Sequence, residues 1–260
     1  TMRKSGILII LLSICSIVWA GDSDTLKESQ PLKYDTNYIE SKRDEIHLAL
    51  VAVNHQTGIA LENTQSEYSL RYNSNNPYRF GLNFNYEWIS LEYTHTIPGL
   101  ELNSKSKGAS ESFDISLGMS GRKFRANAYY KETKGFSHEN IEDLFPNWFL
   151  EEKYYPYSEN LKNKTLNLSM YYTFNHRRFS NSAALRHVDR QIKSAGSAVL
   201  GFVANFEGIY APVSLISYDS LQNTFLNIKD AEYYKLGVNA GYMYTFVIKK
   251  NLFIHGTLIP

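Results

Sequence analysis

The sequence contains a single cysteine, no excess of charge of either sign and no long apolar run after its first twenty residues. Because Cys15 is the only cysteine, a secreted scaffold held together by disulfides is excluded. The 27 basic side chains balance the 26 acidic ones, so we expect no basic face and no nucleic-acid partner. Without apolar runs of about 20 residues, a bundle of membrane helices is excluded as well.

Recognisable ligand motifs are also absent. The sequence has no zinc motif, calcium loop, glycine-rich phosphate loop or Gly-x-Ser-x-Gly nucleophile elbow. Its seven histidines are scattered, with no pair at the spacing of metal ligands. We therefore expect no metal site and no cofactor.

The N-terminus predicts an exported protein. Arg3 and Lys4 form a positive region, and the apolar run from Ile7 to Val18 is too short to span a bilayer as a helix. We expect a signal peptide over residues 1–20, cleaved near Ala20. A lipoprotein signal would use Cys15, but the residue before it is isoleucine where that signal needs a small side chain.

After the signal peptide, the hydrophobic pattern divides the chain into two parts. Residues 21–43 are polar and show no sustained period, so we expect a linker or a short periplasmic segment. Over residues 44–260 the dominant period is two, and we expect one β-barrel domain. In residues 79–88, for example, every second side chain is apolar or aromatic and the others are polar or glycine.

The alternation recurs often enough to predict an antiparallel up-and-down transmembrane β-barrel of about 12 strands, with a range of 10 to 14. Most predicted strands have about nine to eleven residues, the length with which a tilted strand crosses a hydrocarbon layer. The predicted strands are residues 45–54, 66–73, 79–88, 89–97, 112–120, 123–131, 165–174, 179–190, 196–207, 234–244 and 251–259, with two less certain ones near 58–63 and 209–217.

Both strand totals are odd, whereas bacterial single-chain barrels close with an even number. The sequence also ends at Pro260 without the aromatic C-terminal residue that outer-membrane strands commonly carry. We therefore expect the sequence to be truncated at its C-terminus by at least one strand.

The polar face of the predicted strands separates a membrane barrel from a soluble one. It consists mainly of Ser, Asn, Gly and Thr instead of the Lys and Glu expected of a face turned to water. A few charges of both signs share it, and we expect them to form ion pairs across a narrow lumen. These lumen candidates are Glu67, Arg71, Arg79, Glu87, Asp114 and Arg125.

Three sequence blocks carry a resemblance to a known family. Residues 76–91, 121–136 and 179–197 resemble an uncharacterised family of Gram-negative exported proteins, catalogued as a domain of unknown function. The resemblance covers residues 37–255 and implies an outer-membrane-type barrel, but it implies no activity and no catalytic residues. It places the mature protein in the outer membrane of a Gram-negative bacterium, with membrane lipid and the barrel-assembly machinery as partners.

The third block contains the best candidates for chemistry. His187 and Asp189 lie on one face of a predicted strand near Ser194, which is the weak signature of a catalytic site. The alternative is a structural turn, in which Gly196 permits a tight bend and the neighbouring serines cap backbone groups. The residues of this signature turn are Arg190, Gln191, Lys193, Ser194, Gly196 and Ser197.

The basic side chains of the same block have two interpretations. Arg186, Arg190 and Lys193 could hold an anionic group such as a lipid phosphate near the rim, or they could pair with Asp189 and Glu207. Internal pairing is the simpler account.

Taken together, the sequence favours a non-enzymatic outer-membrane barrel that acts as a narrow pore, an assembly component or a structural protein. Two alternatives remain open at this point. One is a lipid-modifying barrel enzyme of the outer membrane, and the other is a soluble periplasmic barrel that binds an apolar ligand.

Overall fold

The computed structural model describes residues 34–260 except for 63–68, 77, 101–103, 187, 212–229, 250–251 and 260. The expected signal peptide lies outside the described residues, as do residues 21–33 of the expected linker and most of the strand expected near 209–217. Two candidate site residues, Glu67 and His187, also lie outside them.

Antiparallel strands dominate the described part of the chain, so the prediction of an all-β fold is confirmed. The strands are β1 (Ile39–Ser41), β2 (His47–Asn54), β3 (Gly58–Glu62), β4 (Ser69–Asn73), β5 (Tyr78–Tyr86), β6 (Ile89–Thr96), β7 (Glu111–Ser120), β8 (Phe124–His138), β9 (Tyr157–Thr173), β10 (Asp189–Gln191), β11 (Ala195–Tyr210), β12 (Asp230–Lys249) and β13 (Leu252–Leu258). The helices are the short α2 (Ser104–Lys107), α3 (Ile141–Leu144), α4 (Trp148–Glu151) and α5 (Asn181–Leu185).

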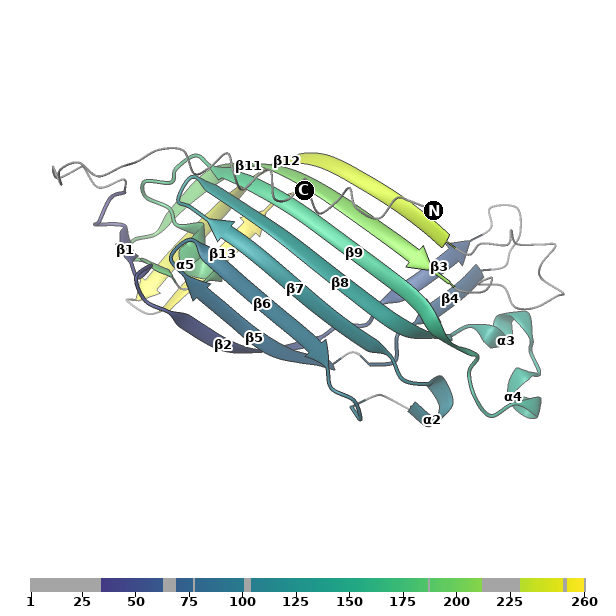
Figure 1. Ribbon diagram of the computed structural model, residues 1–260. Coiled ribbons are helices and arrows are strands. Elements are labelled where there is room, and N and C mark those ends of the chain that lie inside the picture. Colours follow the sequence, from purple (N-terminus) through teal and green to yellow (C-terminus); the bar gives the residue numbers. More distant parts are fainter. Residues whose placement is uncertain are drawn as a thin grey trace, which may run out of the picture. The chain divides into compact units, whose positions relative to one another are not determined.

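One large sheet contains all of these strands except β1 and β10, which pair with each other (Figure 1). Its main path runs β13-β12-β11-β9-β8-β7-β6-β5-β2, so most neighbours in the sheet are neighbours in sequence. The β3–β4 hairpin joins the sheet separately, because β4 pairs with the end of β8.

The register of the sheet keeps apolar and polar side chains on opposite faces. Because side chains alternate along a strand, one aligned row of partners belongs to one face. The row through the middle of the apolar face reads Leu50, Leu82, Tyr93, Ile115, Tyr130, Leu166, Phe206 and Tyr234, from β2 to β12. The next row, on the polar face, reads Gly81, Thr94, Asp114, Lys131, Thr165, Glu207 and Tyr233.

The apolar face is exposed, whereas many side chains of the polar face are buried. Leu50 is 87% exposed, Leu82 61% and Leu236 71%, and large apolar side chains on all the neighbouring strands are exposed with them. On the polar face, Thr94 and Asp114 are buried. This is the reverse of a soluble β-protein, in which the apolar face is the one that is covered.

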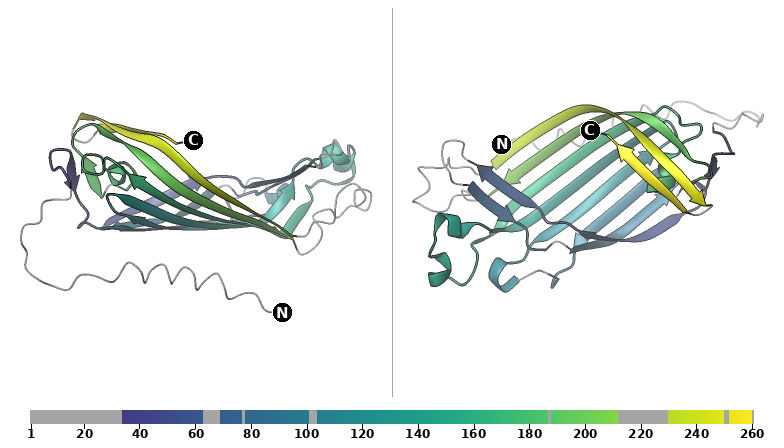
Figure 2. Two further views of the ribbon diagram at one scale, coloured as in Figure 1. Left: turned by 90° about the horizontal axis from the view of Figure 1, so that it is seen from above. Right: turned by 180° about the vertical axis from the view of Figure 1, so that it is seen from behind.

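The main sheet is strongly curved, as Figure 2 shows, but the described strands do not form a closed barrel. β2 and β13 stand at the two ends of its path, and no pairing joins them within the described residues. The fold is therefore an open, curved antiparallel sheet in the part of the chain that the structure describes.

Several strands are longer than the sequence predicts. β8 reaches His138 and β9 begins at Tyr157, so both extend into the interval between the strands predicted over residues 123–131 and 165–174. These extensions are rich in lysine and glutamate and lack a clean apolar alternation. Cross-strand charge pairs accompany them, since Glu132 lies 3.5 Å from Lys164 and 4.0 Å from Lys162.

The strand predicted over residues 179–190 is wrong. The segment forms α5 and then the three-residue β10. In the main sheet, β9 pairs directly with β11, so no further strand lies between them. The Ser-Asn-Ser-Ala-Ala run of the segment, residues 180–184, lacks the β-branched and aromatic side chains that favour a strand.

The helices contribute little to the fold. Each has four or five residues. Within the described residues, no helix has the length and apolar character needed to cross a membrane.

A glycine on the polar face provides a test of the register. A Cβ at Gly81 in β5 would overlap backbone atoms of Tyr93 and Thr94 in β6. We expect Gly81→Ala to lower the free energy of unfolding by about 1–3 kcal/mol because of this overpacking. The measurement is the urea midpoint of the purified protein, followed by tryptophan fluorescence.

The matched control is Gly256 in β13, where an added Cβ would meet no atom within 4 Å. Gly256→Ala should change the free energy of unfolding by less than about 0.5 kcal/mol. Equal midpoints for the two variants would contradict the assigned pairing of β5 with β6.

Candidate functional site

A buried carboxylate organises the middle of the polar face. Asp114 on β7 accepts hydrogen bonds from Arg79 Nε at 2.7 Å, Thr94 Oγ1 at 2.7 Å and the Tyr129 hydroxyl at 3.0 Å. Arg79 and Asp114 are both buried. The pair joins β5 to β7 across the intervening β6, and its charges and hydrogen-bonding capacity are well satisfied.

The chain covers the polar face next to this pair. Between β2 and β5 it leaves the main path, forms the β3–β4 hairpin on the end of β8, and returns. In the crossing segment, Thr57 accepts a hydrogen bond from Lys131 Nζ at 2.7 Å and donates its backbone N–H to Ser74 Oγ at 2.9 Å. Burial, together with the charges of Lys131 and Arg79, lowers the pKa of His55.

An apolar cluster holds the β3–β4 hairpin in place. It packs two residues of β4, Leu70 and Tyr72, against Phe136 of β8 and Leu161 of β9, all of them buried. Tyr72 also stacks on His138, with 5.0 Å between the ring centroids. The hairpin therefore belongs to the packed structure and closes over one end of the polar face.

A second cover lies over the other end of the polar face, beside the turns that join neighbouring strands. It consists of residues 34–43, which include β1, and residues 174–194, which include α5 and β10. β1 pairs with β10 over three residues, from Ile39↔Gln191 to Ser41↔Asp189. Gln191 ties the cover together, since its side-chain amide donates to the carbonyls of Arg178, Tyr38 and Lys193.

Asp189 is the centre of this second cover. Its side chain is fully buried and accepts hydrogen bonds from both Nε and Nη2 of Arg43, at 3.1 and 3.0 Å. The hydroxyls of Ser180 and Ser41 donate to the same carboxylate, at 2.6 and 3.3 Å. Arg43 also donates to the backbone carbonyl of Ser120 at 2.7 Å, which attaches the cover to the end of β7.

Three more arginines gather around the same point. Arg122 lies 3.7 Å from Asp189, with its guanidinium 3.6 Å from the Tyr34 ring centroid. Arg186 donates to Ser90 Oγ and to the Trp88 carbonyl. Burial, together with the charges of Arg125 and Arg43, lowers the pKa of Arg186 to about 10. We call Arg43, Arg122, Arg125 and Arg186 the arginine cluster.

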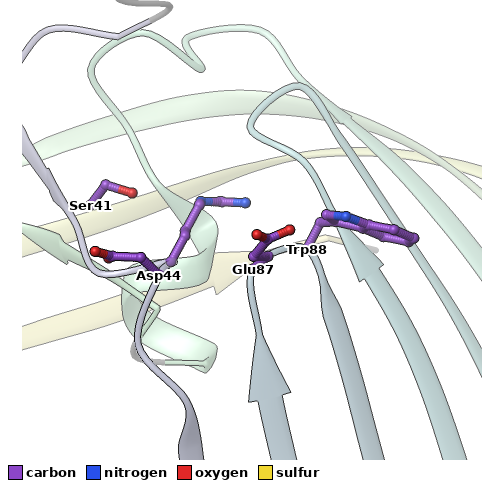
Figure 3. Close-up of a pocket in the computed structure, with 5 residues that line it drawn as sticks. Ser41, Asp44, Glu87 and Trp88 are labelled. Atoms are coloured by element: carbon purple, nitrogen blue, oxygen red, sulfur yellow. The ribbon is translucent and has the colours of Figure 1, made fainter.

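A shallow pocket of about 420 Å³ opens beside the cluster (Figure 3). Ser41, Arg43, Asp44, Glu87 and Trp88 line it. Glu87 occupies the left-handed region, with φ 48°, in the tight turn between β5 and β6. Within the described residues, no group of histidine, cysteine, aspartate and glutamate side chains could hold a metal ion.

The described residues that were predicted to line the lumen lie in different parts of the structure and do not form one network. Arg79 and Asp114 form one ion pair, and Glu87 lies at the pocket. Arg71 is exposed on β4, and its backbone N–H donates to Asn140 Oδ1. Arg125 lies on the polar face of β8 with no carboxylate within 4.0 Å among the described residues.

Two of the three catalytic candidates, Asp189 and Ser194, lie in the described residues, and each already has partners in the fold. Asp189 is occupied by arginine and serine side chains, while Ser194 Oγ accepts the backbone N–H of Val247 at 2.9 Å. Two of the basic candidates also have partners, since Arg190 pairs with Glu40 and Lys193 lies 5.5 Å from the Tyr38 ring centroid.

The bend expected at Gly196 is wrong, whereas the serines expected to cap backbone groups do so, since Ser194 and Ser197 each accept a backbone N–H. Gly196 lies inside β11, opposite Tyr244, where a Cβ would meet the Tyr244 ring and the carbonyl of Met243. Ser197 next to it accepts the backbone N–H of Asn175 and donates to the carbonyl of Ala198. Close approach of neighbouring groups, and not a bend, explains the glycine at this position.

Sequence reasoning missed Arg43 and Ser180 as partners of Asp189. Arg43 belongs to the segment expected to be a linker, and Ser180 to a segment expected to be a strand. Only the poor strand propensity of residues 180–184 could have indicated that the chain folds over the sheet there.

The comparisons with known proteins identify a family but no function. A family model described as a domain of unknown function, DUF4421, matches residues 33–260. This confirms the resemblance to such a family. No curated protein matches the chain, and no solved structure matches it.

The Asp189 contacts generate a stability prediction. Asp189→Asn leaves the partly buried guanidinium of Arg43 without its counter-charge at a fully buried position, so we expect the free energy of unfolding to fall by about 3 kcal/mol. The measurement is the urea midpoint of the purified variant.

Glu159→Gln is the control, because Glu159 is 70% exposed and lies 3.9 Å from Lys134. A surface pair of this kind contributes at most about 1 kcal/mol. Similar midpoints for the two variants would show that Asp189 does not organise the cover.

Proposed function

The chain belongs to the DUF4421 family, whose description assigns no activity, and we propose from its structure that it is an outer-membrane β-barrel protein with a narrow, covered interior. In this proposal its role is structural or assists envelope assembly, and it is not catalytic. The mature protein would reach the outer membrane of a Gram-negative bacterium after signal-peptide cleavage and insert there with the barrel-assembly machinery.

The exposed apolar face is the observation that carries the proposal. It extends without interruption from β2 to β13, and its side chains include Leu48, Leu117, Phe202, Val238 and Ile254, each at least 44% exposed. A soluble monomer rarely exposes a contiguous apolar patch of more than a few hundred Å². Hydrocarbon chains of a lipid bilayer would cover such a face at no cost, because they are as apolar as the side chains.

The position of the apolar face also separates the proposal from a soluble barrel that binds an apolar ligand. A soluble barrel points its apolar side chains inward, where they bury one another. Here the covered face is polar, with the Arg79–Asp114 pair and the Asp189 contacts on it. The arrangement supports a barrel whose outside is turned to lipid and whose inside is turned to water.

Aromatic side chains near the strand ends further support a bilayer setting. Tyr86, Trp88 and Phe124 are exposed beside the turns at one end of the sheet. Aromatic rings at this level are typical of the girdles with which barrels contact the membrane interfaces.

The two covers favour a structural role over an open pore or a catalytic site. One cover places Thr57 and Ser74 over the polar face, and the other fills the turn end with Asp189 and its partners. The buried carboxylates of Asp114 and Asp189 are already bound by arginine, serine, threonine and tyrosine groups of the chain itself. A general acid or base needs a group that exchanges protons with a substrate.

Membrane insertion can be tested by placing charge on each face. We expect Leu82→Arg and Leu117→Arg to block assembly in the outer membrane, since an arginine facing the bilayer midplane costs about 2–4 kcal/mol. The measurements are membrane fractionation and the shift in gel migration between heated and unheated samples.

The matched control is Asn83→Arg on the other face of β5. Asn83 donates to Glu92 Oε2 at 2.9 Å, so an arginine there keeps a carboxylate partner and should be tolerated. Equal loss or equal tolerance of the two sets would exclude the proposed orientation of the faces.

The covered interior predicts little ion conductance in a planar bilayer. Asn54 of β2 pairs with Tyr78 of β5, so residues 55–77 can be replaced by a two-residue Asn-Gly turn that joins the two strands directly. We expect this deletion to raise the single-channel conductance, because it removes the cover formed by the β3–β4 hairpin. A full-length protein that conducts like a general diffusion porin would contradict the covered interior.

A further inference from the structure

The arginine cluster contains more positive charge than its surroundings compensate. Arg43 and Arg122 share the single carboxylate of Asp189, which already binds Arg43 through two hydrogen bonds. Arg125 and Arg186 have no carboxylate within 4.0 Å among the described residues. Charges that are partly removed from water must be paired, or they destabilise the fold.

The backbone is arranged to hold Arg186 against the sheet. Gly118 on β7 lies between Ser90 of β6 and Asn127 of β8, and a Cβ at Gly118 would collide with the Arg186 guanidinium. The guanidinium therefore occupies the space that a side chain at position 118 would fill. It donates to Ser90 Oγ and to the carbonyl of Trp88, which sets its plane and leaves further donors available.

Arg125 faces the same space from the neighbouring strand. It stands opposite Ser120 on one side and Tyr171 on the other, two residues along β8 from Asn127 on the same face. The Arg186 guanidinium lies over Gly118, and Arg125 pairs with Ser120, two residues further along β7 on the same face, so the two like charges lie on neighbouring positions of the polar face. Repulsion between them is relieved when an anion lies between them.

A buried donor of the cluster also lacks a hydrogen bond. Nη1 of Arg122 is buried and has no hydrogen-bond partner in the part of the chain that the structure describes. Its nearest carboxylate oxygen, on Asp189, is 3.7 Å away, beyond hydrogen-bond distance. Unsatisfied donors of this kind are rare in native proteins and commonly indicate an ion or a ligand.

From this geometry we infer that the arginine cluster binds a phosphate-bearing anion, with Arg125 and Arg186 as its principal ligands. The site lies at the end of the polar face that the second cover occupies. Guanidinium groups match the oxygens of a phosphate through two parallel hydrogen bonds, which a point charge cannot reproduce. The two acidic side chains of the neighbouring pocket, Asp44 and Glu87, are exposed, and among the described residues neither forms an ion pair with an arginine of the cluster. The inference does not depend on the proposed membrane location, because it concerns contacts within residues 34–260.

The test is the melting temperature of the full-length protein in detergent micelles, followed by intrinsic fluorescence. One arm compares sodium phosphate with sodium chloride at matched ionic strength. The other arm omits free phosphate and compares micelles that contain phosphatidylglycerol with micelles that contain phosphatidylcholine. A ligand that binds only the folded protein raises its melting temperature with concentration.

Arg186→Lys and Arg125→Lys are the informative variants, since each keeps the charge and removes the planar fork. We expect each to need at least about tenfold more phosphate, or phosphatidylglycerol, for the same rise in melting temperature. Arg71→Lys is the matched control, because Arg71 is exposed on β4 outside the cluster, and it should respond like the unmodified protein.

The two arms identify the source of the anion. A response to free phosphate that depends on Arg186 supports a soluble phosphate-bearing ligand, and a response only to phosphatidylglycerol supports a lipid headgroup. The inference is overturned if no anion raises the melting temperature of the unmodified protein, or if Arg186→Lys and Arg71→Lys respond alike. Failure of this test leaves the face-specific arginine substitutions on β5 unaffected, so it is distinct from failure of the membrane proposal.

Discussion

The two-residue period of side chains, kept in register across the sheet, is the constraint on which the rest of this structure depends. A shift of one residue between any two strands would move apolar side chains to the polar face along the whole strand. The aligned rows through Leu82 and Thr94 are unbroken from strand to strand, and the one irregularity between β2 and β12, at Lys134/Phe136, lies beyond them near the end of β8. One face is therefore apolar along these central rows, while the other collects most of the buried charge.

The two covers follow from what the polar face requires. Its charged groups need partners, and an isolated curved sheet supplies them only between adjacent strands. The chain adds partners by folding the described parts of residues 55–76 over one end and those of residues 34–43 and 174–194 over the other. Arg79 and Asp114 neutralise each other, whereas the arginine cluster keeps an excess of positive charge. In both places, a charge that is removed from water needs a charge of opposite sign beside it. This requirement accounts for the stability of the Arg79–Asp114 pair and for the anion that we infer at the arginine cluster.

Strand prediction succeeded where hydrophobic alternation was strong and failed where other forces decided the structure. Residues 79–88 alternate cleanly, and β5 covers Tyr78–Tyr86. The extensions of β8 and β9 were missed because lysine and glutamate occupy them, and their contribution depends on the charge that lies opposite. The strand predicted over residues 179–190 was wrong. Two of its apolar residues, Phe179 and Val188, are buried in the second cover and do not belong to a strand of the main sheet.

By itself, the sequence determined the all-β class, the antiparallel order of most strands and the separation of apolar from polar faces, since all three follow from local periodicity. It also indicated the family through its three blocks. Only the tertiary structure decided which charges meet, because Arg43 and Asp189 are 146 residues apart and no local pattern relates them. The curvature of the sheet and the return of the chain over its polar face bring such groups together, and neither property is encoded in the spacing of neighbouring side chains.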